Sequence, residues 1–330
     1  MGGTRLHLAW GLLAICLWIL WPAPASSQAG EAAGMITELK VNRGRVEVRP
    51  AGTQEWRKVG PLLTLRAGDT VRATDDATAV VLLSGGRGSV KVSKANSPFV
   101  VPAPQAGESK VQKAMTLLDA SFGFLSGTAK EEPRATLSTR GGPRPPVILS
   151  PRNGPVLPDT LTFEWLGSRF HRHTLRIVGP AGVVLEKKDL TGGRFNYPSD
   201  APPLTPGVRY TVQVLSGNHP SQQAWFEVLD PSRAQAIRRD LEDLEQGAGS
   251  SVPPNTLVAL RVGYLANNGL IHNARLTLIP ALSKDPDEPT LHLLLAKLYE
   301  KSGLPEQAAE EYDEARFLLS VPAKRQVPLK

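Results

Sequence analysis

The residues best suited to chemistry lie in the middle of the chain, and they do not form a recognised catalytic pattern. His171 and His173 are two positions apart. On a strand that spacing would place both imidazoles on one side, as half of a metal site. No carboxylate is spaced to complete such a site. We therefore interpret the two histidines as polar residues at a loop edge, with a metal site as the weaker alternative.

Other polar clusters also lack the spacing that their chemistry requires. Asp69, Asp75 and Asp76 do not follow the alternating acidic pattern of a calcium loop, which favours carboxylates at turns. The glycine-rich run 85–88 is followed by neither a helix pattern nor a Lys-Ser pair, as a phosphate cradle would be. Ser150 and Asp159 share no motif with His171, and no G-x-S-x-G or H-E-x-x-H pattern occurs. The sequence predicts no enzyme, no cofactor and no metal.

The first residues have the layout of a secretory signal peptide. Arg5 precedes the uncharged run Leu8–Trp21, and Ala23-Pro24-Ala25 is a small-x-small cleavage site. We expect residues 1–25 to be removed and the protein to be periplasmic or secreted. The alternative is an uncleaved N-terminal anchor, and only then do we expect membrane contact. Cys16, the single cysteine, lies inside the run and is interpreted as an apolar filler.

The composition after residue 25 limits what holds the domains together and what they bind. Without a cysteine no disulfide can form, so packing must stabilise each domain. Residues 26–34 are small and polar and are expected to be frayed. The formal net charge is +7, and residues 35–100 carry 11 Lys and Arg against 6 Asp and Glu. This basic domain could meet an anionic envelope or cell-wall component, or its charge could serve solubility alone. In that compartment we expect no nucleic acid partner.

Residues 35–101 are predicted to form a small antiparallel β-sandwich. Arg45–Arg49 alternates with period two, so that Val46 and Val48 share one face, and Gly-containing turns follow. The segment resembles the FecR-type domain through Gly44-x-Val46-x-Val48, Trp56, the motif over 68–74 and the apolar strand 80–85. The resemblance implies an extracytoplasmic sensing or binding module. Signal-transducing members also have a cytoplasmic segment before a membrane helix, whereas here about six residues precede the apolar run.

Residues 102–146 are expected to be a linker with one possible short helix, and residues 147–229 a second β-sandwich. Val111, Met115 and Leu118 have helical spacing in the linker. In the second module we expect Leu161, Phe163 and Trp165 to face inward and 173–178 to pair with 183–185 as a hairpin. It resembles fibronectin type III and immunoglobulin-like modules through the entry Pro151–Gly154, the core Trp165 and the segment 206–212.

The C-terminal third changes to helical patterning. Asp230 and Pro231 are suited to the first positions of a helix, with apolar residues on one face, so 230–250 is predicted to be a capping helix and linker. Residues 255–320 repeat with a period of 34, in which Gly269, Ala274, Leu278 and Ala281 match Gly303, Ala308, Tyr312 and Ala315. Pro286 and Ser320 do not match. Residues 321–330 are taken as a tail.

This 34-residue unit resembles the tetratricopeptide repeat. Gly269 and Gly303 stand at the turns, the alanines stand where helices cross closely, and Tyr299 and Tyr312 are expected between units. The resemblance implies protein partners along the first helix of each repeat, a face that we call the groove face. Its residues would be Thr256, Ala259, Gly263, Asn267, Thr290, Leu293, Lys297 and Lys301.

The sequence as a whole indicates a non-enzymatic extracytoplasmic binding or scaffold protein of the bacterial envelope. The β-modules would attach to an envelope component or ligand, and the repeats would hold other envelope proteins. One alternative is a sensory or regulatory component of envelope signalling. Another is a protein that binds a cell-wall polymer, with stacking of copies through the short repeat pair also open.

Overall fold

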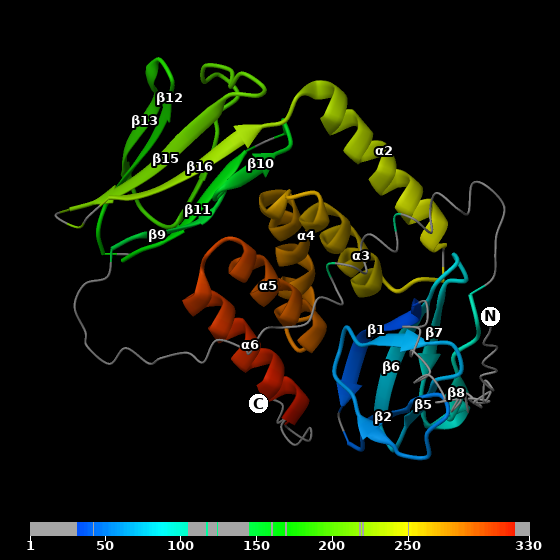
Figure 1. Ribbon diagram of the computed structural model, residues 1–330. Coiled ribbons are helices and arrows are strands. Elements are labelled where there is room, and N and C mark those ends of the chain that lie inside the picture. Colours follow the sequence, from blue (N-terminus) through cyan, green and yellow to red (C-terminus); the bar gives the residue numbers. More distant parts are fainter. Residues whose placement is uncertain are drawn as a thin grey trace, which may run out of the picture. The chain divides into compact units, whose positions relative to one another are not determined.

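The chain forms β-modules first and helices last. We describe a computed structural model, which covers residues 32–41, 43–104, 117, 124, 145–159, 161–168, 170–217, 219, 221–249 and 251–320. Strands occupy the N-terminal and middle regions and five helices occupy the C-terminal region (Figure 1). The expected order of β-sheet modules followed by helices is therefore confirmed. The signal-peptide prediction and the helix predicted around Met115 lie outside the described residues, of which the linker contributes only Leu117 and Phe124.

The first module consists of two four-stranded antiparallel sheets. One has the order β4-β1-β6-β7, formed by β4 (Thr64–Arg66), β1 (Ala32–Val41), β6 (Ala77–Leu83) and β7 (Ser89–Val92). The other has the order β3-β2-β5-β8, formed by β3 (Arg57–Lys58), β2 (Val46–Arg49), β5 (Thr70–Ala73) and β8 (Phe99–Val100), with the short 3-10 turn η1 (Lys94–Asn96) before β8. Val46 and Val48 both enter the core between these sheets.

Strand β1 begins earlier than the sequence suggested. Residues 26–34 were expected to be frayed, yet the strand starts at Ala32, so the prediction is wrong for its last three residues. The small residues are needed for strand pairing rather than for mobility. A Cβ on Gly34 would lie 2.6 Å from the carbonyl oxygen of Leu82 on the neighbouring strand, and Ala33 is fully buried. Close approach of the two backbones thus requires a glycine here.

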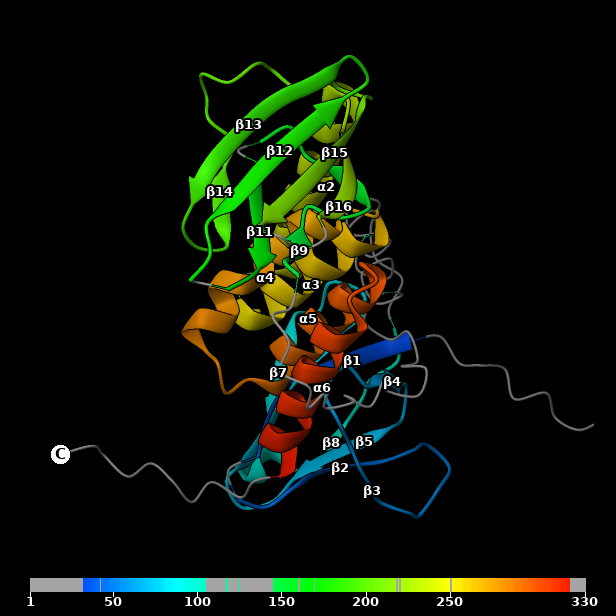
Figure 2. The same ribbon diagram turned by 90° about the vertical axis from the view of Figure 1, so that its left-hand side faces the viewer.

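The second module is a sandwich of a five-stranded and a three-stranded sheet, seen as two layers in Figure 2. The larger sheet has the order β10-β16-β15-β12-β13, formed by β10 (Gly154–Val156), β16 (Gln222–Val228), β15 (Arg209–Ser216), β12 (His173–Gly179) and β13 (Gly182–Leu190). The smaller has the order β14-β11-β9, formed by β14 (Arg194–Asn196), β11 (Thr162–Leu166) and β9 (Val147–Ser150).

The inner faces of these two sheets match the alternation in the sequence. Leu161, Phe163 and Trp165 are all buried in the core of the sandwich. The predicted hairpin is present as β12 and β13, which pair antiparallel. The exception to antiparallel pairing among the described strands is β10, which lies parallel to β16.

The helical region comprises α2 (Pro231–Ala248), α3 (Pro254–Asn267), α4 (Ile271–Lys284), α5 (Pro289–Lys301) and α6 (Pro305–Ser320). Helix α2 begins at the N-cap Asp230, whose carboxylate accepts the Arg233 N–H, and its buried face includes Ile237 and Leu241. Helices α3 and α4 form one hairpin, and α5 and α6 form the other. Gly269 and Gly303 join the helices of each pair with φ values of +77° and +71°, which a side chain would oppose.

Both β-modules contact the helices. Strand β1 lies against α3, α5 and α6, and β10 lies against α4. The second module is joined to α4 by the ion pair of Glu164 with Arg275, by the bond between Ser150 Oγ and His272 Nδ1 (2.7 Å), and by the Leu157 N–H donating to Asn273 Oδ1 (3.0 Å). The side chains of Glu164 and Arg275 are 15% and 9% exposed, so the pair is largely shielded from water.

We expect Glu164→Ala to lower the free energy of unfolding by about 3–5 kcal/mol, because it leaves the buried Arg275 without its carboxylate partner. Arg275→Ala should lower it less, because Glu164 keeps Arg194 at 3.9 Å. The double variant Glu164→Leu/Arg275→Met should lose much less than the two single variants added together. Urea unfolding monitored by circular dichroism measures all three. Additive losses would show that the two side chains do not act as a pair.

Candidate binding surfaces

The groove face is partly inside the protein. Thr256, Ala259, Gly263 and Thr290 are buried. Leu293 and Lys297 are half-buried, whereas Asn267 and Lys301 are exposed. Half of the eight positions are thus buried, and the two exposed positions lie at the C-terminal ends of α3 and α5.

Strand β1 covers the buried part of the groove face. The Thr256 N–H and hydroxyl both donate to Glu38 Oε1, at 3.0 and 2.8 Å, and the Thr256 hydroxyl lies 2.9 Å from that of Thr37. Met35, on the same strand, packs in the cluster that contains Ala259 and the leucines of α5. The chain itself therefore occupies the positions where the family resemblance implies a partner.

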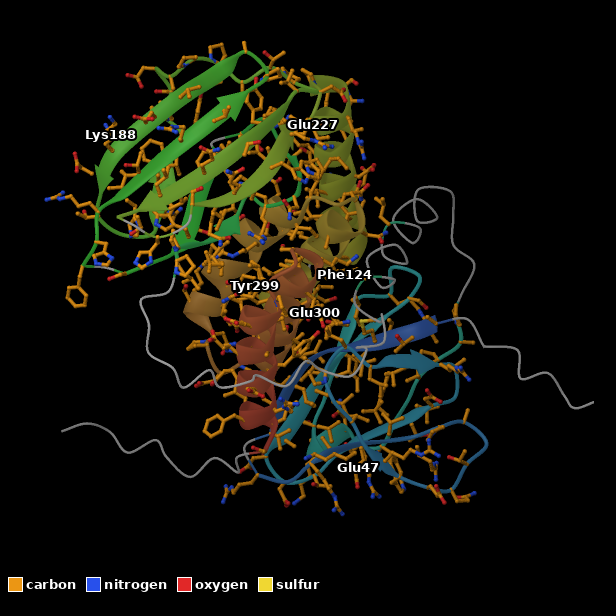
Figure 3. The ribbon with its side chains drawn as sticks, turned by 60° about the vertical axis from the view of Figure 1, so that its left-hand side comes forward. Glu47, Phe124, Lys188, Glu227, Tyr299 and Glu300 are labelled. Carbon is orange, nitrogen blue, oxygen red and sulfur yellow. The ribbon has the colours of Figure 1, made fainter. Side chains whose placement is uncertain are left out.

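Phe124 occupies a further part of the face. Its side chain is 6% exposed, and its ring centroid lies 6.0 Å from Lys297 Nζ and 5.4 Å from Lys301 Nζ. Lys297 Nζ also donates to the Phe124 carbonyl oxygen at 3.5 Å. Burial, followed by the like charge of Lys301, lowers the pKa of Lys297. Figure 3 places Phe124 beside α5, the helix that carries Tyr299 and Glu300. The two lysines thus bind an aromatic side chain of their own chain.

A second surface, the basic face, lies on the outer side of the sheet β3-β2-β5-β8. In β2 and β5, Glu47 stands directly opposite Arg72, and Lys58 of β3 stands on its other side. The Glu47 carboxylate, labelled in Figure 3, accepts Arg72 at 2.7 Å and Arg45 at 3.1 Å. Arg49 lies two positions after Glu47 and therefore on the same side of β2.

Trp56 stacks with two arginines of the basic face. The guanidinium carbon of Arg72 lies 3.9 Å from the indole centroid and that of Arg49 lies 5.2 Å from it. Among the described residues Arg49 and Lys58 have no carboxylate partner, while Arg45 and Arg72 share Glu47. Four cations therefore surround one carboxylate, and stacking holds Arg49 in place while its N–H groups stay available.

The other residues singled out in the sequence have structural roles. Asp69 accepts the backbone N–H groups of Ala51 (2.9 Å) and Arg66 (2.8 Å), as a turn carboxylate does. His171 and His173 do not share one side of a strand, which the weaker alternative of a metal site would require. Strand β12 begins at His173, which is buried, whereas His171 precedes the strand and is exposed.

Ser150 and Asp159 make their contacts away from His171. Ser150 bonds to His272 and Asp159 pairs with Arg238 at 2.6 Å. Within the described part of the chain, no group of three or more His, Cys, Asp and Glu side chains is placed to hold a metal ion.

A hollow of about 550 Å³ opens in the second module. Buried Val156, Leu161 and Val228 contribute to its lining, and Asp159 with its partner Arg238 lies beside it. The Tyr197 hydroxyl donates to the Pro202 carbonyl, so its hydrogen is already used. Burial, followed by the proximity of Tyr210, raises the pKa of Tyr197. The hollow offers shape and apolar area but few polar groups for recognition.

Two buried titratable residues lie at the joints between modules, and sequence analysis missed both. Glu288, fully buried before α5, accepts the Thr290 hydroxyl (2.8 Å) and the Leu39 N–H of β1 (3.3 Å) through Oε1. Burial, with Glu38 nearby, raises its pKa to about 7. His272 of α4 is also buried, which lowers its pKa to about 4. Neither residue belongs to a motif, since each is defined by a contact across modules.

No protein-family model matches the chain, and no curated protein matches it. Among the described residues, none of the helices is both long and apolar enough to cross a bilayer.

Glu288 should make the stability of the protein depend on pH. Its pKa is about 7 when folded and 4.5 ordinarily, so the carboxyl is neutral in both states at low pH. As the pH rises through 4.5 to 7, the unfolded chain loses this proton first, which favours unfolding by about 3 kcal/mol above pH 7. We expect Glu288→Gln to gain stability relative to wild type between pH 5 and pH 8, measured by urea unfolding at each pH.

Asp287→Asn is the matched control, because the neighbouring Asp287 is exposed. Its stability relative to wild type should change little over the same pH range. A difference between Glu288→Gln and wild type that stays constant from pH 5 to pH 8 would contradict the assignment.

Proposed function

We propose that the chain is a non-enzymatic binding scaffold of the bacterial envelope, whose first module attaches to an anionic envelope or cell-wall component. The basic face carries this proposal. It combines the stacked side chain of Trp56 with Arg49 and Lys58, two cations that have no carboxylate partner in the part of the chain that the structure describes. A planar guanidinium binds phosphate or carboxylate in a bidentate manner, which suits an anionic polymer better than a neutral one.

The FecR-like and tetratricopeptide-like resemblances support a binding role without chemistry. The fibronectin- or immunoglobulin-like character of the second module fits the same role. A sensory role in envelope signalling stays the runner-up. A sensory role would use the same anionic ligand. It would also require the signal to be passed on, and none of the described contacts points to such a step.

A protein partner on the groove face is a second part of the proposal. The positions open to such a partner are Asn267 and Lys301, at the C-terminal ends of α3 and α5. Lys301 is an exposed cation beside the Phe124 ring, which fits an acidic partner. A partner extending further along the face would compete with Phe124 for Lys297 and with β1 for Thr256.

We expect the double variant Arg49→Ala/Lys58→Ala to bind purified anionic cell-wall material about tenfold more weakly than the wild type, since each lost charge contact contributes up to about 1 kcal/mol. Co-sedimentation over a range of protein concentrations gives the affinity. Binding should also weaken as salt is raised from 50 to 300 mM.

The matched control removes the same charge from the first module away from the basic face, as Lys91→Ala/Lys94→Ala. Both lysines are exposed, on β7 and η1. Equal loss in the two double variants would mean that net charge, not the basic face, determines binding. Binding that does not respond to salt would exclude an ionic contact.

For the groove face we expect Lys301→Glu to abolish recovery of an acidic partner from native envelope extract, because the substitution reverses the charge that meets it. Lys284→Glu at the end of α4 is the control, since it makes the same charge change at an exposed site. Deleting the helices is a poorer test, because Met35 and Leu82 of the first module pack against them. A partner retained equally by both variants would place its site elsewhere.

A further inference from the structure

The loop between β11 and β12 carries Phe170, the most exposed large apolar side chain among the described residues. Phe170 is 90% exposed, and Leu166, at the end of β11, is 46% exposed. Exposed leucines are ordinary in soluble proteins, but a phenylalanine that is almost fully in water at a loop tip is not. The two side chains belong to one short segment and could enter the same apolar environment.

The turn that presents Phe170 is held by hydrogen bonds. The Phe170 N–H donates to Ser168 Oγ at 3.3 Å, and the His171 N–H donates to the Ser168 carbonyl at 3.2 Å. That carbonyl also lies 3.2 Å from His173 Nε2. Phe170 is thus directed outward by a turn anchored to a buried strand residue, so burying its side chain elsewhere requires little further ordering of the backbone.

Gly167 allows the turn to lie close to this anchor. A Cβ at Gly167 would come within 2.7 Å of the His173 ring, and the ring itself packs edge-on against the core residue Trp165. The loop is therefore attached to the core of the second module at its base and apolar at its tip.

Basic and imidazole groups surround the apolar tip. Arg172 follows in the same loop and donates to the Asp189 carbonyl at 3.3 Å, and the His171 ring lies 5.8 Å from that of His219. Lys187 and Lys188 are exposed on β13, the edge strand, whose Leu190 pairs with His173 at the base of the loop. Strand β13 also carries two carboxylates: Glu186, which is paired with Arg176 and Lys188, and the exposed Asp189.

We propose that this loop is a lipid-contact site, in which Phe170 and Leu166 enter the interface of an anionic bilayer while Arg172 and Lys187 meet the headgroups. Apolar side chains flanked by cations match the layering of such a bilayer, with acyl chains below and negative charge at the surface. Insertion of so few apolar residues gives weak and reversible binding. The site lies on the second module and is independent of the basic face of the first.

Vesicle co-sedimentation of the chain without residues 1–25 tests the proposal, because the apolar run Leu8–Trp21 would itself insert into a bilayer. We expect binding to vesicles of phosphatidylcholine with phosphatidylglycerol and little binding to phosphatidylcholine alone. Phe170→Ser should lower the partition coefficient about tenfold. Even incomplete burial of a phenylalanine side chain contributes a transfer free energy that corresponds to about this factor. Phe317→Ser is the matched control, because Phe317 is 58% exposed on α6, outside this loop.

A second measurement reports depth directly. Cys16, the single cysteine, lies within residues 1–25, so Phe170→Cys in the chain without those residues gives one site for an environment-sensitive fluorophore. Its emission should shift to the blue with anionic vesicles, whereas a label at Phe317→Cys should not shift. The absence of a shift at position 170, or equal loss of binding in both serine variants, would overturn the proposal. A shift that depends on protein concentration without lipid would assign the loop to contact between copies of the chain instead, and would also overturn it.

Discussion

The structure depends on burying both faces of strand β1. Ile36 and Leu39 enter the core of the first module, whereas Met35 enters the core formed by the helices. A strand with water on one face alternates apolar and polar residues, but this strand is buried almost continuously from Ala33 to Thr37. Its pairing with β6 shifts register between Ile36 and Glu38, which changes the direction in which the following side chains point. Because one strand serves two cores, the first module and the helices are expected to unfold together.

Such sharing places polar groups where water cannot reach them, and their partners come from other modules. Thr256 is satisfied by Glu38, Glu288 by Leu39 and Thr290, and His272 by Ser150. The match is incomplete at Glu288, whose Oε2 has no partner among the described residues. A buried carboxylate with one unsatisfied oxygen holds its proton more tightly, which is the origin of its raised pKa. At His272, burial also favours the neutral form, but for an imidazole this lowers the pKa instead of raising it. The two joints therefore respond oppositely to acidification.

Local patterns in the sequence were enough to predict much of the fold. The alternation at 161–165, the turn at 179–182 and the N-cap at Asp230 each depend on neighbouring residues, and the structure has the corresponding strand, hairpin and helix. The 34-residue repeat likewise predicted the glycines at both helix turns. The roles of Gly34 and Thr256 could not be predicted from their neighbours in the sequence. Their roles come from Leu82 and Glu38, which lie 48 and 218 positions away. For the same reason the groove face could be named residue by residue, while its coverage by β1 and Phe124 could not be foreseen.

The chain's occupation of its own groove face limits the binding role that we propose. A repeat pair with a free groove would select partners through buried contacts at Thr256 and Thr290. Here Thr256 bonds to Glu38 of β1, and Thr290 bonds to Glu288, which accepts the Leu39 N–H of β1. Recognition is then left to outer surfaces such as the basic face and the β11–β12 loop, where contacts are ionic or shallow and individually weak. Weak contacts on different modules of one chain add strength when both are engaged, because the first contact raises the effective concentration for the second. Because buried polar contacts hold the modules together, less conformational entropy would be lost when the second surface binds. The helices can therefore join the modules and still contribute to the proposed envelope binding.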